Sequence, residues 1–216
     1  MAPLMSKSKS REKGNSILEF ALIVPFMVTA LLGVVGIGMT LARAIQVNQV
    51  TRDTGHMFFD GVDFSQTANQ NIVGRLAYGM GLASDNVGDI DTNGNGTIIL
   101  SQILKIGATE CSNGGYATTA SCPNYNQIVI EKRIVIGNSS LRTSSFGTPS
   151  STLIATDGSL TAHNYCTDPS AVVPSTSAAP SLSLTAGQYS YVVESYFITP
   201  SLSGFLGDQA YSYIMM

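Results

Sequence analysis

The feature that most constrains this chain is an almost uninterrupted apolar segment near its N-terminus, residues 17–42. It reads ILEFALIVPFMVTALLGVVGIGMTLA, and its only charged side chain is Glu19. As an α-helix, these 26 residues span about 39 Å, which is enough to cross the ~30 Å hydrocarbon core of a bilayer. The segment therefore predicts a transmembrane helix that the mature protein retains.

Basic side chains lie directly before this segment. Residues 7–13 contain four of them, and the first basic residue after the segment is Arg43. The positive-inside rule places the N-terminus in the cytoplasm and the chain beyond the helix outside. The alternative is a cleaved secretory signal, because Ala42-Arg43-Ala44 has the small-x-small pattern of a cleavage site. Such signals have an apolar core of about 7–15 residues, so we favour the retained helix.

The composition of the remaining chain is typical of an exported, β-rich domain. Only 12% of all residues are charged, and Gly, Ser, Thr and Asn are abundant. Acidic side chains outnumber basic ones beyond residue 14, so the chain offers no basic surface for nucleic acid. His56 and His163 lack metal-like or triad-like spacing, and no G-x-S-x-G elbow or Walker-type phosphate loop occurs. We therefore expect no enzyme active site.

Four runs in the C-terminal part have the character of β-strands bounded by turn residues: 97–106, 127–136, 188–198 and a short edge strand at 210–215. We expect an α+β fold, with a long N-terminal transmembrane helix followed by a small antiparallel sheet domain that has long loops.

The segments between these elements divide the chain. A polar extension of the helix is expected to end near Thr54, with Gly55 as its stop, and residues 66–82 have moderate helical character. Residues 139–186 are rich in Ser, Thr, Pro and Gly and read mostly as loop. The expected division is a basic leader, the helix with its extension, and an exported domain: 1–14, 15–54 and 55–216.

The residues around Glu19 resemble the start of type IV prepilins. Proteins of that superfamily carry a short basic leader, Gly before the scissile bond, and Glu at the fifth mature position, often followed by an aromatic residue. By this resemblance Gly14 would precede the cut, Asn15 would be the new N-terminus, and Glu19 and Phe20 would be mature positions five and six.

The wider string GNSILEFALIVP, from Gly14 to Pro25, is more specifically similar to the TadE-like proteins of tight-adherence (Flp) pilus systems. These share an E-F-A-L-x-x-P core close to the start of the membrane helix. The chain departs from the family after the helix, where an Ala/Arg-rich stretch is common and residues 45–52 read IQVNQVTR instead.

The resemblance implies a minor pilin or pseudopilin-like component of pilus assembly in the bacterial inner membrane. Its partners would be a prepilin peptidase, the membrane assembly platform with its ATPase motor, the pilins and membrane lipid. An uncleaved membrane-anchored binding or adhesion module and a secreted hydrolase are the alternatives. The mature N-terminus separates the three: Asn15 for the first, Met1 for the second and Ile45 for the third.

The apolar segment carries features that predict contacts with other helices. Glu19 can accept a charge-assisted bond from a neighbour's free α-amino group, or it is a boundary residue tolerated near the interface. Pro25 predicts a kink or loosened turn over residues 21–25. Small side chains recur along one face, which either allows close helix approach or reflects the frequency of Gly and Thr in membrane helices: Thr29, Gly33, Gly36, Thr40 and Ala44.

Three cysteines, Cys111, Cys122 and Cys166, lie in the part expected to be exported. Export permits one disulfide and leaves one thiol over. We favour a bond between Cys111 and Cys122, because they are 11 positions apart and flank a stretch rich in Gly, Asn and Ser. The alternative is three free thiols.

Residues 91–98, DTNGNGTI, begin like a calcium-binding loop. The ligands would be Asp91, Asn93, Asn95 and Thr97, but the twelfth position is Gln102 in place of the bidentate Glu. We expect at most a weak Ca²⁺ site here and no other cofactor. An Asn-Gly turn leading into the first strand explains the same residues, and we favour that reading.

Overall fold

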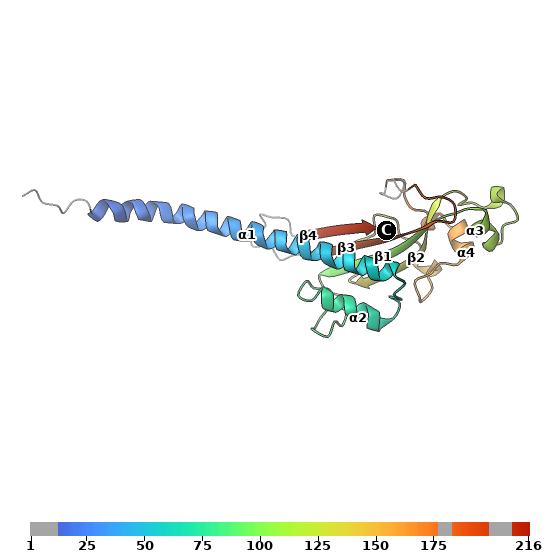
Figure 1. Ribbon diagram of the computed structural model, residues 1–216, viewed down its shortest axis with the longest axis horizontal. Helices are drawn as coiled ribbons and strands as arrows, with labels where there is room; N and C mark the ends of the chain where they lie inside the picture. Colours follow the sequence, from blue (N-terminus) through green and yellow to red (C-terminus); the bar gives the residue numbers. More distant parts are fainter. Residues whose placement is uncertain (1–12, 177–182, 199–208) are drawn as a thin grey trace, which may run out of the picture.

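A computed structural model of the protein describes residues 13–176, 183–198 and 209–216. One long helix, α1 (Lys13–Phe59), extends away from a body of strands and short helices (Figure 1). The body lies beside the C-terminal part of α1, where Val47 is the first buried side chain among those described in this helix. This arrangement confirms the expected α+β fold with a long N-terminal helix.

The helix α1 continues to Phe59, so the expected stop at Gly55 is wrong. Gly55 instead lies where α1 meets β4 (Gln209–Met215): a Cβ there would be 2.9 Å from Cε of Met216 and 3.1 Å from Cγ2 of Ile214. The glycine therefore permits a close helix–sheet approach, which local sequence does not reveal.

The residue that terminates the helix is Gly61, two positions beyond Phe59, which adopts a φ of +86°. The amide of Gly61 donates to the carbonyl of Phe58, and the amide of Val62 donates to that of Met57. This pair of bonds around a left-handed glycine is the Schellman motif, which closes the last turn of many helices.

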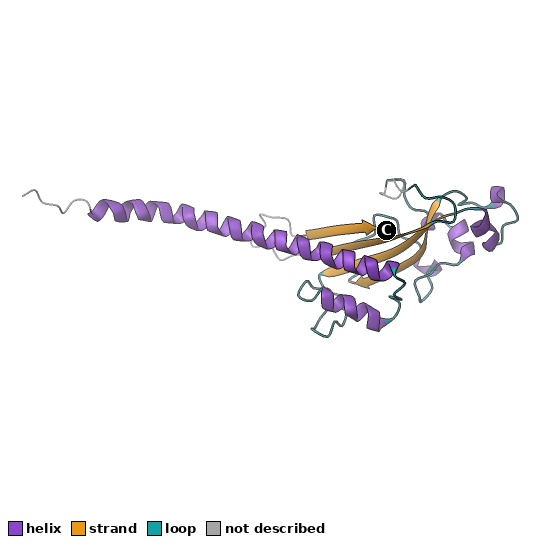
Figure 2. Ribbon diagram, viewed as in Figure 1, coloured by secondary structure: helices purple, strands orange, loops and turns teal. Residues whose placement is uncertain are grey.

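The strands among the described residues form a four-stranded antiparallel sheet with the strand order β2-β1-β3-β4 (Figure 2). Its other strands are β1 (Gly96–Lys105), β2 (Ile128–Gly137) and β3 (Tyr189–Ile198). All four predicted strands are confirmed, each to within one residue at either end. The register of β1 against β2 shifts once, between Gln102 and Ile103.

The two faces of the sheet are covered by different parts of the chain. On one face, strand residues such as Ile98, Leu100 and Phe197 form a core with Val50 and Phe58 of α1. This core also takes in the helix α2 (Thr67–Leu76) through its buried Val73. On the other face, Phe146 and Val173 pack on strand residues Ile103, Ile130 and Val192. The sheet is thus the middle layer of the body.

The segment that follows β2 is more ordered than expected, because it contains short helices and pairs with the outer edge of that strand. The helices are η2 (Ser151–Leu153), α4 (Ala162–Thr167) and η3 (Pro169–Ala171). Three backbone bonds attach the segment to β2: Arg133 to Gly158, Leu160 to Glu131 and Val173 to Ile128. Helices of three to six residues are too short to produce a recognisable periodicity in sequence. The helix α3 (Ala108–Asn113) lies beside α4, and η1 (Thr119–Ser121) follows α3 along the chain.

The close contact between α2 and the following loop yields a test of packing. A Cβ at Gly74 would lie 2.2 Å from the carbonyl oxygen of Gly88. Alanine is favoured over glycine in helices by ~1 kcal/mol, yet Gly74→Ala should lower the free energy of unfolding by about 1–3 kcal/mol, because neither backbone can yield easily. Thermal unfolding of the full chain in detergent, followed by near-UV circular dichroism, measures the change.

The matched control is Gly33→Ala in α1, where a Cβ meets nothing within 4 Å. It should leave the unfolding transition of the body unchanged. A Gly74→Ala protein as stable as wild type would contradict the close packing.

Candidate functional site

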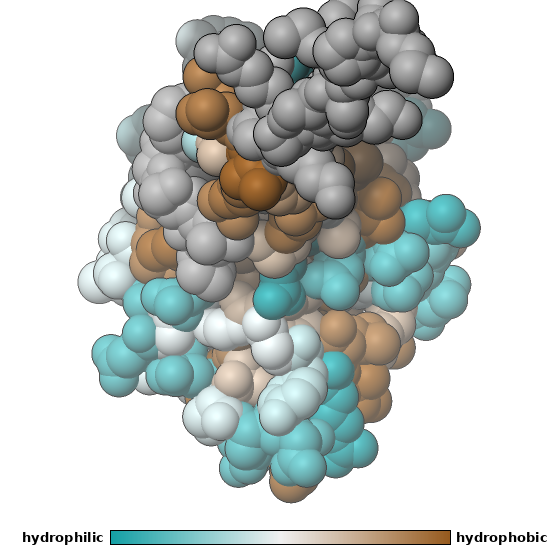
Figure 3. Space-filling view, turned by 90° about the vertical axis from the view of Figure 1, so that its left-hand side faces the viewer, coloured by the Kyte–Doolittle hydropathy of each residue, from teal (hydrophilic) through white to brown (hydrophobic). Residues whose placement is uncertain are grey.

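The N-terminal part of α1 exposes apolar side chains on all sides. Ile17 and Phe26 are each 72% exposed, and Leu41 is still 60% exposed. In Figure 3, which views the molecule from this end, apolar side chains gather above the centre of the picture, and more hydrophilic ones lie below and to the sides. Exposure of this extent is unfavourable in water, so a helix that is apolar all round belongs in a non-aqueous environment. The helix is long and apolar enough to cross a membrane, which is consistent with single-pass anchoring.

The residues that the prepilin resemblance singles out lie at the far end of this helix. Gly14 and Asn15 lie in its first turn, and the side chains of Glu19 and Phe20 are exposed. All four are therefore remote from the folded body. Their roles in processing and assembly stay predictions.

The helix runs through Pro25 without interruption. A proline has no amide hydrogen, so the carbonyl of Ala21 lacks its usual helical donor. The hydroxyl of Thr29 donates to the carbonyls of Pro25 at 3.1 Å and Phe26 at 2.9 Å. The expected loosening over residues 21–25 thus does not break the helix.

The small residues that were predicted to form a packing face do lie in the exposed part of α1. The hydroxyl of Thr40 donates to the carbonyl of Gly36 at 3.1 Å, and so is satisfied within the helix. At Gly33 there is open space for a Cβ. Within this face Thr29, Gly33 and Thr40 are exposed and Gly36 and Ala44 are partly exposed. Its role in packing stays a prediction.

The calcium-like segment forms a tight turn into β1. Oδ1 of Asp91 accepts a hydrogen bond from the amide of Asn93 at 2.9 Å, and its carbonyl accepts one from Gly94 at 3.2 Å. The carbonyl of Asn95 accepts from the amide of Ile198, and Thr97 is buried within the sheet at 1% exposure. These contacts describe a turn, and a weak calcium site stays a prediction.

A disulfide joins Cys111 of α3 to Cys122 at the end of η1, the pair that the sequence favours. Their Cα atoms are 5.8 Å apart, within the range that a disulfide requires. Sequence reasoning did not anticipate the position of Cys166, whose sulfur lies within 4.8 Å of both partners. Burial, followed by the nearby carboxylate of Glu110, raises the pKa of the Cys166 thiol. The attacking thiolate is therefore scarce, which favours the existing bond.

This three-sulfur cluster predicts a replacement disulfide. In Cys122→Ser, Cys111 should bond to Cys166 under the same oxidising conditions, because the two sulfurs are already close. Maleimide labelling after denaturation should then find no free thiol in the variant and one in the wild type. The Cys166→Ser control should also have none, since it keeps the original bond. Two labelled thiols in Cys122→Ser would contradict the predicted exchange of partners.

A buried polar cluster on the sheet was not predicted from the sequence. Glu194 of β3 is 1% exposed and accepts hydrogen bonds from Ser144, from the amide and hydroxyl of Ser145, and from the hydroxyl of Tyr211 at 2.9 Å. The guanidinium of Arg142 lies 3.9 Å from the centre of the Tyr211 ring. The signal available in the sequence was a charged residue, Glu194, within an apolar strand, because a buried charge requires hydrogen-bond partners. The cluster fastens the 142–147 segment to β3 and β4.

Arg133 lies under the same segment and donates to the carbonyl of Gly147 at 2.7 Å. Burial lowers the pKa of Arg133 to about 10, and the negative charge of Glu194 opposes that shift. The guanidinium therefore stays protonated at neutral pH. The donors around Glu194 and the backbone contact of Arg133 describe a structural fastening.

The comparisons with known proteins identify the N-terminal segment. Residues 14–56 match the model of a family described as TadE-like protein, which covers about a fifth of the chain. The resemblance seen in the sequence is thereby confirmed for this segment. No curated protein and no solved structure matches the chain.

Proposed function

We propose that this protein is a minor pilin or pseudopilin-like component of a tight-adherence pilus system, held in the bacterial inner membrane by α1. One observation carries the proposal: the match to the TadE-like family includes the apolar part of α1, which the body leaves exposed. A match to this family indicates a pilus-associated protein with a structural role. An apolar helix that extends from a folded body fits a part that inserts in lipid and contacts other subunits.

The geometry suits a protein that transmits position from the membrane to an exported body. Val47, Val50 and Phe58 are buried between α1 and the sheet, and Gly55 allows the helix to lie close to β4. The membrane part and the packed part belong to one continuous helix. A displacement of the helix by a partner would therefore move the sheet with it.

The charge distribution supports an N-terminus in the cytoplasm and a body outside. Four basic side chains precede the apolar segment, and the body has a disulfide, which suits an oxidising compartment. In this orientation a prepilin peptidase would act on the leader. The assembly platform and the pilins would contact α1, together with membrane lipid.

The first test concerns processing after Gly14. A peptidase that recognises the small residue before the cut should not accept a β-branched one, so Gly14→Val should retain the leader. Intact-mass measurement of protein from cells with the cognate peptidase should show Asn15 as the first residue of the wild type and Met1 as that of the variant. Equal processing of both would rule out this cleavage site.

The second test concerns Glu19 as an assembly residue. A carboxylate inside a membrane helix is costly, which is consistent with a functional role. Glu19→Gln keeps the shape but removes a charge-assisted bond worth about 1.5–3 kcal/mol to a neighbour's α-amino group. The variant should insert and fold, because the sheet begins far away at Gly96. It should fail to co-purify with its pilus partners, because the charge-assisted bond is lost.

The control for Glu19→Gln is Asp53→Asn, which removes an exposed carboxylate from the part of the same helix that lies beside the sheet. It should associate like wild type. If Glu19→Gln also keeps wild-type association, Glu19 is a tolerated boundary residue and has no role in assembly.

A further inference from the structure

The turn that follows α2, residues 77–81, lies where the apolar part of α1 ends. The helix α2 runs back along α1 toward the membrane end of the body (Figure 1). Nη1 of Arg43 donates to the carbonyl of Gly79 at 3.3 Å and to Oε1 of Gln46 at 3.2 Å. Arg43 is the first charged residue after the apolar segment. The contact therefore places this turn beside the point at which α1 would leave a bilayer.

The turn is held firmly in this place. Ala77 is fully buried and Met80 is 9% exposed, and both belong to the core between α1 and the sheet. Gly79 and Gly81 have positive φ values of +76° and +88°, which the tight path of the chain requires. A Cβ at Gly81 would lie 2.9 Å from Cβ of Asn95. The position of the turn relative to α1 is thus set by packing.

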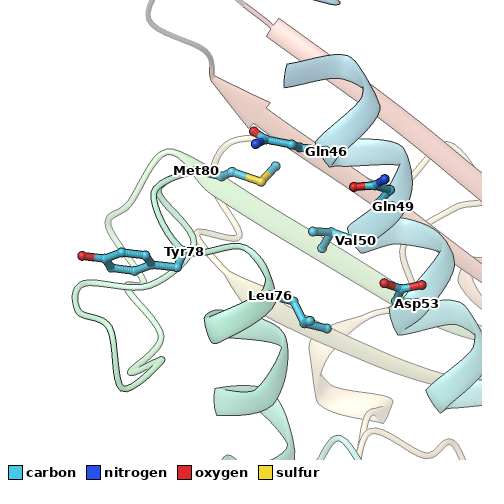
Figure 4. Close-up of a pocket in the computed structure, with 7 residues that line it drawn as sticks. All are labelled: Gln46, Gln49, Val50, Asp53, Leu76, Tyr78 and Met80. Carbon is cyan, nitrogen blue, oxygen red and sulfur yellow. The ribbon is translucent and has the colours of Figure 1, made fainter. Parts of the chain in front are cut away.

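Tyr78 lies in sequence between the buried residues Ala77 and Met80, and its side chain points away from the body. A groove of about 240 Å³ separates α1 from this part of the chain, and Figure 4 shows Leu76 and Met80 directed toward it while the Tyr78 ring points outward. The Tyr78 side chain is 60% exposed. Val87 and Leu76 of the same region are also exposed, at 52% and 45%.

We propose that the 77–81 turn rests on the lipid surface, with the Tyr78 ring in the headgroup layer beside the body's own membrane helix. This inference rests on the proposed membrane role of α1. About 20 helical residues cross the hydrocarbon core, so a helix that enters near Glu19 leaves it near residue 39. Arg43 and the turn that it binds then lie in the headgroup layer. Tyrosine is enriched at that depth, because its ring is apolar and its hydroxyl is wet.

The charges near the turn indicate which lipid surface it fits. The carboxylate of Asp85 accepts hydrogen bonds from the amides of Val87, Gly88 and Asp89, and Asp89 accepts one from Asn71. Arg75 donates to the carbonyl of Val87. This loop has no excess of basic side chains. The contact therefore depends on aromatic and apolar side chains, and it needs no anionic lipid.

The absence of tryptophan from the sequence makes a direct test possible. Tyr78→Trp introduces a single reporter, and the full chain is reconstituted in phosphatidylcholine vesicles that carry a spin label on the lipid headgroup or at mid-chain. We expect the reporter at position 78 to lose fluorescence mainly with the headgroup label. Its emission maximum should also lie at a shorter wavelength than that of the same variant unfolded in water without detergent. Neither effect should depend on salt.

Two matched variants separate this inference from the membrane role of the helix. Phe26→Trp places the reporter inside the apolar segment and should be quenched by the mid-chain label. Tyr125→Trp replaces a tyrosine that is 44% exposed at the opposite end of the sheet, and neither label should quench it. If Phe26→Trp is quenched and Tyr78→Trp behaves like Tyr125→Trp, the lipid contact is refuted and the membrane helix stands.

Two further outcomes would also overturn the inference. If neither Phe26→Trp nor Tyr78→Trp is quenched, the proposed membrane role of α1 fails together with the contact. If the emission of Tyr78→Trp changes with protein density in the vesicle but not with either label, the turn contacts a neighbouring subunit in place of lipid.

Discussion

The packing of the C-terminal part of α1 on the sheet joins two halves with opposite solvent requirements. Before Val47 the helix exposes apolar side chains that need a non-aqueous surrounding. From Val47 to Phe58 the same helix buries one face against the strands. Because the helix has no break, the orientation of its apolar part determines the position of the body.

The rest of the body supports this contact. The sheet presents one face to α1 and α2, and it carries the segment 138–176 on the other face and along the edge of β2. The buried carboxylate of Glu194 and its donors hold that segment in place at one end. Elsewhere in the body, the disulfide between Cys111 and Cys122 joins α3 to the part of the chain that leads into β2. Both devices stabilise parts of the chain that have little regular structure.

The proposed lipid contact follows from the same geometry. A single helix that crosses a bilayer can tilt, and a body packed on it tilts with it unless a second point touches the surface. The 77–81 turn would provide such a point, because its hydrogen bond from Arg43 and the buried side chains of Ala77 and Met80 attach it to α1 and the core. A body held at two points would present its far end, with the disulfide, at a fixed orientation to partners outside the membrane.

Several elements were predictable from the sequence because their signals are local. The apolar segment and the four strands each depend on the composition and periodicity of a short stretch, and the strand limits were right to within one residue. The basic leader 1–14 lies mostly outside the described residues and stays a prediction. The family resemblance likewise depended on a contiguous string, and the match to residues 14–56 confirmed it. Gly55 was misread because a glycine at a helix end and a glycine at a close helix–sheet contact look the same in sequence.

The tertiary structure alone decided the contacts between distant residues. The sequence by itself determined a long apolar helix, an acidic β-rich remainder and, from their spacing, the favoured pair of cysteines. It could not place Cys166 beside that pair, supply Glu194 with donors from Ser144 and Ser145, or bring Gly79 to Arg43. Each of those contacts joins residues more than thirty positions apart, and such proximity depends on how the helices and loops pack around the sheet.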